Sequence, residues 1–227
     1  MSDEFSTRII PLFPLSLVQF PGVVTPLHIF EERYRKLLRD VTVTDKVFGI
    51  TFLSEDDDTG EPPVGRIGCT VEIIAEQTMP DGRSNILCTG GTRYRTVRHL
   101  HDDLYLQAEI ELFRDEPEDG ELAPLTERAA RLFQRVIAAG KKLKDASPVE
   151  QQDIPDLPDD PESLSFLIAA SLDLSNEEKQ QLLEMTLASA RLTKLNDLLA
   201  RLAVDYERRA RTHQISKHNG HGGPVRF

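Results

Sequence analysis

The strongest constraint on the fold is a stretch near the N-terminus, residues 11–34, in which prolines interrupt an apolar run and a helix pattern follows directly: PLFPLSLVQFPGVVTPLHIFEERY. Proline has no backbone N–H and a fixed φ angle, so it falls at strand edges, strand ends or turns. Pro21–Gly22 therefore indicates a turn between two strands. From Phe30–Glu31 the spacing predicts a short helix through Asp40. Its buried stripe is expected to be Tyr34, Leu37, Leu38 and Val41.

The apolar pattern changes its period near residue 115. Before this point, runs rich in β-branched and aromatic residues predict strands. Apart from the two strands around Pro21–Gly22, they cover residues 47–53, 67–75, 85–89, 94–97 and 105–112. Pro80–Gly82 is typical of a tight turn, and Gly90–Gly91 allows a bend or bulge. About six strands and one helix are expected to close into a small mixed barrel.

After residue 121 the period becomes helical. Helices are expected over residues 122–143, from Pro161 to about Leu172, after a capping box at Ser175–Glu178, and along a final stripe of leucines ending at Tyr206. A proline-rich acidic connector, residues 145–160, is expected to be an extended loop. The fold class predicted is thus α+β, with a β-barrel subdomain (residues 1–118), a helical-bundle subdomain (119–211) and a disordered tail (212–227).

Composition limits the classes of function. The 227 residues carry a net charge of −11, which disfavours nucleic acid as the main partner. The cysteines, Cys69 and Cys88, lie in apolar strand runs without metal-type spacing, so we expect core packing in a reducing compartment. The N-terminus lacks the features of a signal peptide, and no run approaches the roughly 18 apolar residues of a membrane span. We predict a cytoplasmic protein without a membrane partner.

Motifs for catalysis are absent from the sequence. Gly140–Lys141 lacks the preceding glycine and the following Ser or Thr of a phosphate-binding loop, and there is no G-x-S-x-G elbow. His28 interrupts an apolar segment, which leaves open a ligand contact or a structural, hydrogen-bonded or solvent-facing ring. No acid, His or Cys accompanies it at metal spacing. We therefore predict no catalytic residue, metal, cofactor or small-molecule substrate.

Three motifs in order point to a family. P-L-F-P-L, then P-G, then P-L-x-I-F-E-x-R-Y opens the chain, and D-P-E-x-L-S-F-x-I-A-A (160–170) and L-S-x-x-E-K-Q-x-L-L-E (174–184) follow. This arrangement, over approximately residues 8–207, resembles the N-terminal substrate-binding domain of Lon proteases, a domain also found in cereblon. The resemblance implies a PUA-like barrel followed by a helical bundle. Nothing here resembles the Lon ATPase or protease domains, so the expectation is a stand-alone Lon-domain protein.

The resemblance implies a non-catalytic module that binds a polypeptide or protein client and presents it to a separate protease or chaperone. The alternative is an RNA-binding PUA-like protein, because the tail carries several arginines. The oligomeric state is left open. Candidate peptide-binding residues are Phe20, Pro21, Leu27, His28 and Phe30, although the aromatic and apolar residues of this stretch could instead form the barrel core. Residues assigned to structure are Pro26, Glu31, Arg33, Tyr34 and Arg93, with Glu31 and Arg33 as a buried pair fixing the helix to the barrel.

Overall fold

The computed structural model describes residues 7–57, 60–143 and 156–219. They group into two compact units. The first, called the sheet unit, contains the residues up to 117 together with 169–187, and the second, called the helical unit, contains 118–168 and 188 onward. Compact units need not coincide with independently folding domains, so the predicted boundary between residues 118 and 119 stays a prediction.

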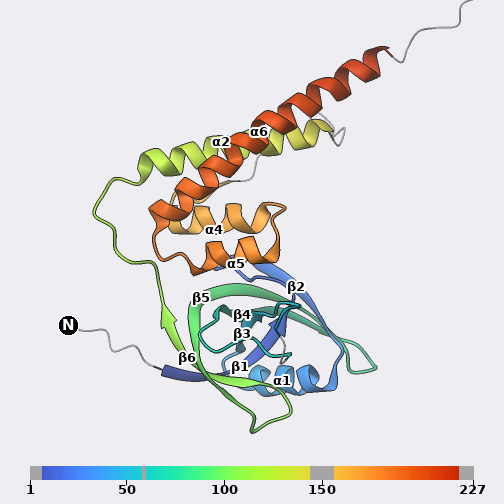
Figure 1. Ribbon diagram of the computed structural model, residues 1–227. Helices are drawn as coiled ribbons and strands as arrows, with labels where there is room; N and C mark the ends of the chain where they lie inside the picture. Colours follow the sequence, from blue (N-terminus) through green and yellow to red (C-terminus); the bar gives the residue numbers. More distant parts are fainter. Residues whose placement is uncertain (1–6, 58–59, 144–155, 220–227) are drawn as a thin grey trace, which may run out of the picture. The chain divides into compact units, whose positions relative to one another are not determined.

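The sheet unit holds all six strands of the described residues (Figure 1). The strands are β1 (Thr7–Leu15), β2 (Val24–Ile29), β3 (Val47–Phe52), β4 (Ile67–Thr78), β5 (Ser84–Leu100) and β6 (Gln107–Phe113). Their order is β2-β5-β4-β3-β1-β6, and β6 also pairs with β5, so five strands form a closed ring of pairings. The β1–β3 pair is parallel and the other pairs are antiparallel, which makes the sheet mixed. β2 lies outside the ring, paired with β5.

One strand prediction is corrected. Residues 85–89 and 94–97 belong to a single long strand, β5, rather than to two strands. Gly90 does not end the strand. Its missing side chain instead lets the carbonyl oxygen of Phe20 approach the backbone where a Cβ would lie. The pairing with β4 shifts register between Cys69 and Val71 at this bend, as expected for a bulge.

The helix α1 (Glu32–Thr42) confirms the predicted stripe, since Tyr34, Leu37, Leu38 and Val41 are all buried. These side chains pack with apolar residues of the strands, and α1 lies against one end of the strands in Figure 1. The strand residues of this cluster include Phe13, Phe48, Ile50, Val71, Ile86 and Cys88. Cys69 and Cys88 are fully buried, which confirms core packing, and burial raises the pKa of each thiol to about 12.

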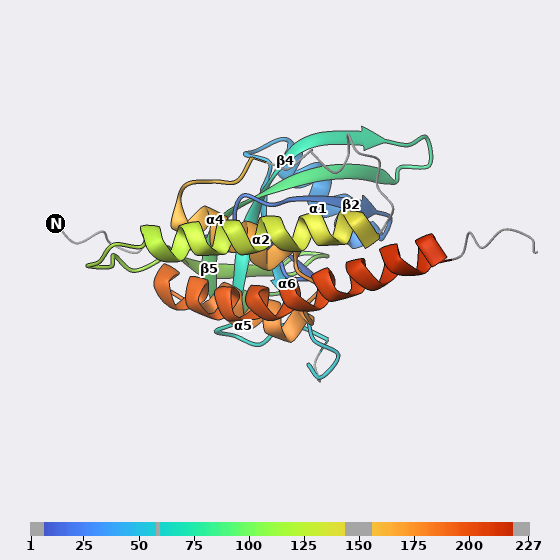
Figure 2. The same ribbon diagram turned by 90° about the horizontal axis from the view of Figure 1, so that it is seen from above.

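Four helices follow the strands in the described residues. They are α2 (Ala123–Leu143), α4 (Pro161–Ser171), α5 (Asn176–Glu184) and α6 (Ala188–Asn219). Two of them, α4 and α5, begin at the predicted caps. Asp160 accepts a hydrogen bond from the N–H of Ser163 at 2.8 Å, and Ser175 and Glu178 form the predicted capping box. α2 and α6 run side by side within the helical unit (Figure 2). α5 groups with the sheet unit, where Gln180 donates to the carbonyl oxygen of Ile67 at 2.9 Å.

The predicted disordered tail is corrected at its beginning. Residues 212–219 continue α6, because no glycine or proline interrupts the segment before Gly220. Ion pairs from Asp205 to Arg208 and Arg209 add support at helical spacing. Residues 145–155 of the predicted connector, and residues 220–227 of the predicted tail, lie outside the described residues.

Candidate functional site

The outer strand β2 and the hairpin of β4 and β5 present two adjacent cross-strand rows of side chains. Residues directly opposite in paired strands share a face of the sheet. Pro26 pairs with Leu87, which pairs with Ala75, and this row is apolar. His28 pairs with Asn85, which pairs with Gln77, and this row is polar. An apolar row thus lies next to a row of amides and one imidazole.

These rows line a hollow of about 400 Å³, here called the β2 groove. Its lining is Pro26, Leu27, His28, Ala75, Glu76, Gln77, Asn85, Ile86 and Leu87. Leu87 keeps 40 % of its surface exposed and Phe30, just beyond β2, keeps 60 %. A β-bulge between Ile73 and Ala75 also leaves Ile74 exposed on β4. This part of the sheet therefore exposes to water several large apolar side chains from neighbouring strands.

The polar row is partly fixed. Nδ1 of His28 and Oδ1 of Asn85 lie 2.7 Å apart, so Nδ1 donates to the amide oxygen. In the neutral ring, Nε2 is then an acceptor, and the amide nitrogen of Asn85 stays a donor. The ring of His28 stacks on that of Phe30 with centroids 5.9 Å apart. Of the alternatives left open for His28, the structure shows an exposed, hydrogen-bonded ring that lines the β2 groove.

The structure brings together only part of the predicted peptide-binding set. Leu27 and His28 line the β2 groove and Phe30 stacks beside it. The prediction that Phe20 binds peptide is wrong, because its side chain is buried and offers almost no exposed surface. The turn that carries it folds back on β5, where Gly22 N–H donates to the carbonyl oxygen of Gly90 at 2.9 Å. Pro21 sits in this turn, half-buried and outside the lining of the groove.

Among the residues assigned to structure, Pro26 lines the β2 groove, a role that sequence reasoning missed. Its signal was a proline in a strand, which is tolerated on an outer strand such as β2. Glu31 and Arg33 do pair, with Oε2 and Nε 2.9 Å apart, but the pair is solvent-exposed rather than buried. The reason is helical phase: Tyr34 points into the core, so the preceding residue points outward.

Arg93 is buried inside the sheet unit. Its guanidinium donates to the carbonyl oxygens of Leu183 and Met185, at 2.8 and 2.7 Å, and pairs with Asp115. These contacts tie β5 to the end of α5. The guanidinium also lies 4.7 Å from the ring centroid of Phe113. A structural role for Arg93 accounts for all of these contacts.

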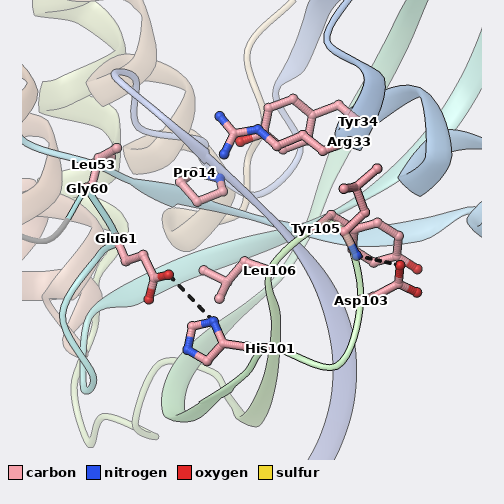
Figure 3. Close-up of a pocket in the computed structure, with 11 residues that line it drawn as sticks. Pro14, Arg33, Tyr34, Leu53, Gly60, Glu61, His101, Asp103, Tyr105 and Leu106 are labelled. Atoms are coloured by element: carbon pink, nitrogen blue, oxygen red, sulfur yellow. Dashed lines mark hydrogen bonds and ion pairs between the residues drawn. The ribbon is translucent and has the colours of Figure 1, made fainter.

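A second hollow, about 350 Å³ in volume, lies elsewhere on the sheet unit (Figure 3). Its lining comes from β1, the start of α1 and the connections after β3 and β5, namely Pro14, Arg33, Tyr34, Leu53, Gly60, Glu61, His101, Asp103, Leu104, Tyr105 and Leu106. We call it the α1 pocket. Because these segments lie far apart in the sequence, no sequence pattern predicted that they would line one pocket.

Two residues that line the α1 pocket, Asp103 and Tyr105, belong to a charged network that includes Lys36 and Asp40 outside the lining. Lys36 Nζ donates to Asp40 at 2.7 Å and to Asp103 at 2.8 Å, and the hydroxyl of Tyr105 donates to Asp40 at 2.9 Å. The hydrogen bonds from Lys36 hold the pKa values of Asp40 and Asp103 below their ordinary value of 3.8. On the other side, Nδ1 of His101 lies 3.6 Å from a carboxylate oxygen of Glu61.

This network gives a testable pH dependence. Carboxyls whose folded-state pKa is lowered stabilise the fold above the unfolded-state value, and this contribution is lost as the pH falls through the folded-state pKa. The stability of the natural chain is therefore expected to fall more steeply below about pH 4 than that of Lys36→Met. Urea unfolding at a series of pH values measures this, with Arg39→Gln on the exposed face of α1 as the control. Equal slopes for the natural chain and Lys36→Met would contradict it.

Among the described residues, no group of three or more His, Cys, Asp or Glu side chains could hold a metal ion. Within the same residues, none of the helices is long and apolar enough to cross a membrane. The cytoplasmic location stays a prediction.

The family described as the ATP-dependent protease La (LON) substrate-binding domain matches residues 9–201. The chain belongs to this family. The match confirms the predicted resemblance to the Lon substrate-binding domain over most of the sequence.

Relatives of this Lon-family protein include the Lon protease of Anaeromyxobacter dehalogenans, 27 % identical over 206 residues that cover 88 % of this chain and 24 % of the relative. Lon protease 2 of Desulfotalea psychrophila is 29 % identical over 199 residues, which cover 86 % of this chain and 25 % of the relative. The chain thus spans about a quarter of the length of the curated relatives it matches.

Two solved structures share the fold of this Lon-family protein. A Lon N-terminal domain protein from Xanthomonas campestris superimposes with a TM-score of 0.62 at 26 % identity, covering 83 % of this chain and 96 % of that one. The N-terminal domain of Lon protease from the Mycobacterium avium complex gives a TM-score of 0.65 at 18 % identity, covering 85 % and 98 %. Because the sequence identity to the Mycobacterium avium complex structure is only 18 %, this second match supports the α+β fold alone.

Proposed function

We propose that this protein is a non-catalytic module that binds polypeptide clients in the β2 groove. The observation that carries the proposal is the exposed apolar row Pro26–Leu87–Ala75 beside a polar row, on a strand that pairs on one side only among the described residues. Membership of the substrate-binding family supports the same class of ligand. We propose further that the closed sheet is a PUA-like barrel, that the later helices form a bundle, and that the module presents its clients to a separate protease or chaperone.

The geometry of the β2 groove suits an extended polypeptide. An apolar side chain of the client would occupy the apolar row, where burial contributes about 25 cal/mol per Å². The amides of Asn85 and Gln77 would hydrogen-bond to the client backbone, which every polypeptide carries. The free edge of β2 could pair with the same segment as an added strand. Such contacts are tolerant of client sequence but require exposed backbone, which favours unfolded segments.

The direct test is a fluorescence-anisotropy titration of the full-length protein with a labelled unfolded polypeptide, beside labelled RNA, at low and moderate salt. Saturable binding of the polypeptide that changes little with salt is expected, because apolar and backbone contacts are weakly screened. Binding of RNA with a steep salt dependence would favour the nucleic-acid alternative instead. Binding of neither would overturn the proposal of a general client site and direct the search to one folded partner.

A pair of variants on β5 locates the site. Leu87→Ser is expected to weaken polypeptide binding about tenfold, because it removes the largest apolar side chain of the apolar row, worth about 1.5 kcal/mol or more when covered. Val97→Ser is the matched control, since Val97 lies on the same strand, is equally exposed and is not part of the groove lining. Anisotropy titrations of both variants measure the difference. If both variants lose the same affinity for the polypeptide, or if neither loses any, the client site does not lie on this face of the sheet.

A further inference from the structure

The charged side chains that line the α1 pocket differ in how many hydrogen-bond or ion-pair partners they already have. Asp103 accepts hydrogen bonds from Lys36 Nζ at 2.8 Å and from the N–H of Leu104 at 2.6 Å. The two carboxylate oxygens of Glu61 lie 3.5 and 3.6 Å from the Nδ1 atoms of His99 and His101. Asp103 and Glu61, the two acidic residues of the lining, therefore already have cationic or hydrogen-bond-donating partners.

Arg33 differs from these acids. Its Nε donates to Glu31 at 2.9 Å, and its guanidinium stacks 4.5 Å from the ring centroid of Tyr34. Its two terminal nitrogens have no hydrogen-bond partner among the described residues, and Arg33 lines the hollow together with Pro14 (Figure 3). The ion pair with Glu31 and the stacking on Tyr34 restrict the rotation of the Arg33 guanidinium. Binding of a ligand to this guanidinium therefore costs less side-chain conformational entropy.

Stability alone does not explain this arrangement. The side chains of Arg33 and Glu31 are 51 % and 42 % exposed, and an exposed ion pair contributes little to the stability of a fold. In the α1 pocket, each of the two tyrosine rings already holds a cation on one face. Arg33 lies on Tyr34, and Lys36 lies on Tyr105 with its ammonium 5.1 Å from the ring centroid.

We propose that the α1 pocket binds a carboxylate of a polypeptide, either an acidic side-chain group or the free C-terminal group, through the two terminal nitrogens of Arg33. The planar guanidinium fork matches a carboxylate with two parallel hydrogen bonds. Pro14 and Leu106 also line the pocket, and their apolar side chains can accommodate the carbon atoms that carry the carboxylate. This site shares no lining residue with the β2 groove and does not depend on it.

The test is an NMR titration of the full-length ¹⁵N-labelled protein with three short acetylated peptides of otherwise identical sequence. One has a free C-terminal carboxylate, one is amidated, and one is amidated with an internal glutamate. We expect shifts at Leu53 and Leu106 with the carboxylate-bearing peptides and none with the neutral one. Binding of only one acidic peptide would support the proposal and identify the source of the carboxylate. Binding of all three alike, or of none, would overturn it.

Variants separate the role of Arg33 from general electrostatics. Arg33→Gln is expected to weaken carboxylate binding about tenfold or more, since glutamine lacks the charge and the two parallel donors of the guanidinium. Arg39→Gln removes the same charge from an exposed position of α1 that does not line the pocket, and it should leave binding nearly unchanged. Equal effects of the two variants would overturn the proposal. Leu87→Ser should not alter carboxylate binding, so failure of the β2 groove proposal remains distinguishable.

Discussion

Replacing Arg93 with methionine is expected to lower the free energy of unfolding by about 3–5 kcal/mol, the cost of removing one partner from a buried ion pair. Arg93 is almost fully buried and Asp115 is nearly so. Methionine fills much of the same space but leaves the carboxylate of Asp115 and the carbonyl oxygens of Leu183 and Met185 without this donor. A buried carboxylate that loses its cation is costly, because water cannot replace it.

The sequence supplies a matched control two residues along the same strand. Arg95 is exposed, so Arg95→Met should change stability by less than about 0.5 kcal/mol. Urea unfolding followed by circular dichroism compares the two variants. If Arg93→Met fails to fold, Arg93→Lys, which keeps the charge but loses the fork, should fold with intermediate stability. Similar stabilities for the variants at positions 93 and 95 would show that the buried network contributes little.

Replacing Gly68 with alanine is expected to cost about 3 kcal/mol. A Cβ at this position would lie 2.5 Å from the hydroxyl oxygen of Tyr94 and 2.7 Å from the carbonyl oxygen of Ile50. Tyr94 is fully buried and its hydroxyl hydrogen-bonds to Thr51 at 2.6 Å, so the ring cannot move without breaking that bond. Overpacking of this kind costs about 1–3 kcal/mol, and the lost hydrogen bond adds about 1 kcal/mol.

Gly120→Ala is the control for Gly68→Ala, because nothing lies within 4 Å of a Cβ at position 120 and its φ angle is not positive. Its stability should match that of the natural protein within about 0.5 kcal/mol. Thermal and urea unfolding measure both variants. The double variant Gly68→Ala, Tyr94→Leu should lose less stability than the sum of its single variants, because the smaller side chain relieves the clash. Strict additivity would show that Tyr94 is not what excludes a side chain at position 68.

One short segment contributes to both candidate sites. Pro26, Leu27 and His28 line the β2 groove, and Arg33 and Tyr34 line the α1 pocket. Both proposals therefore concern the proline-interrupted stretch that dominates the sequence, but they assign different chemistry to its two ends. A client with an apolar segment and an acidic group could use either site or both, and the Leu87 and Arg33 variants separate these contributions.

Features that depend on local sequence could be predicted. The buried face of α1, the caps at Asp160 and Ser175, and the core positions of Cys69 and Cys88 all follow from residues within a few positions of one another. Helical phase and capping are set by local backbone geometry, so tertiary contacts did not alter them. The family was also visible, because its motifs are short runs in a fixed order.

The tertiary structure decided which residues of those runs reach solvent. Phe20 is buried because its turn folds onto Gly90, a residue far away in the sequence. The continuity of β5, the closure of the ring through β6 and the four segments that line the α1 pocket all depend on pairings between residues far apart in the sequence. Composition and periodicity indicate which side chains prefer burial. The register of strands that are distant in sequence determines which of these side chains are actually buried.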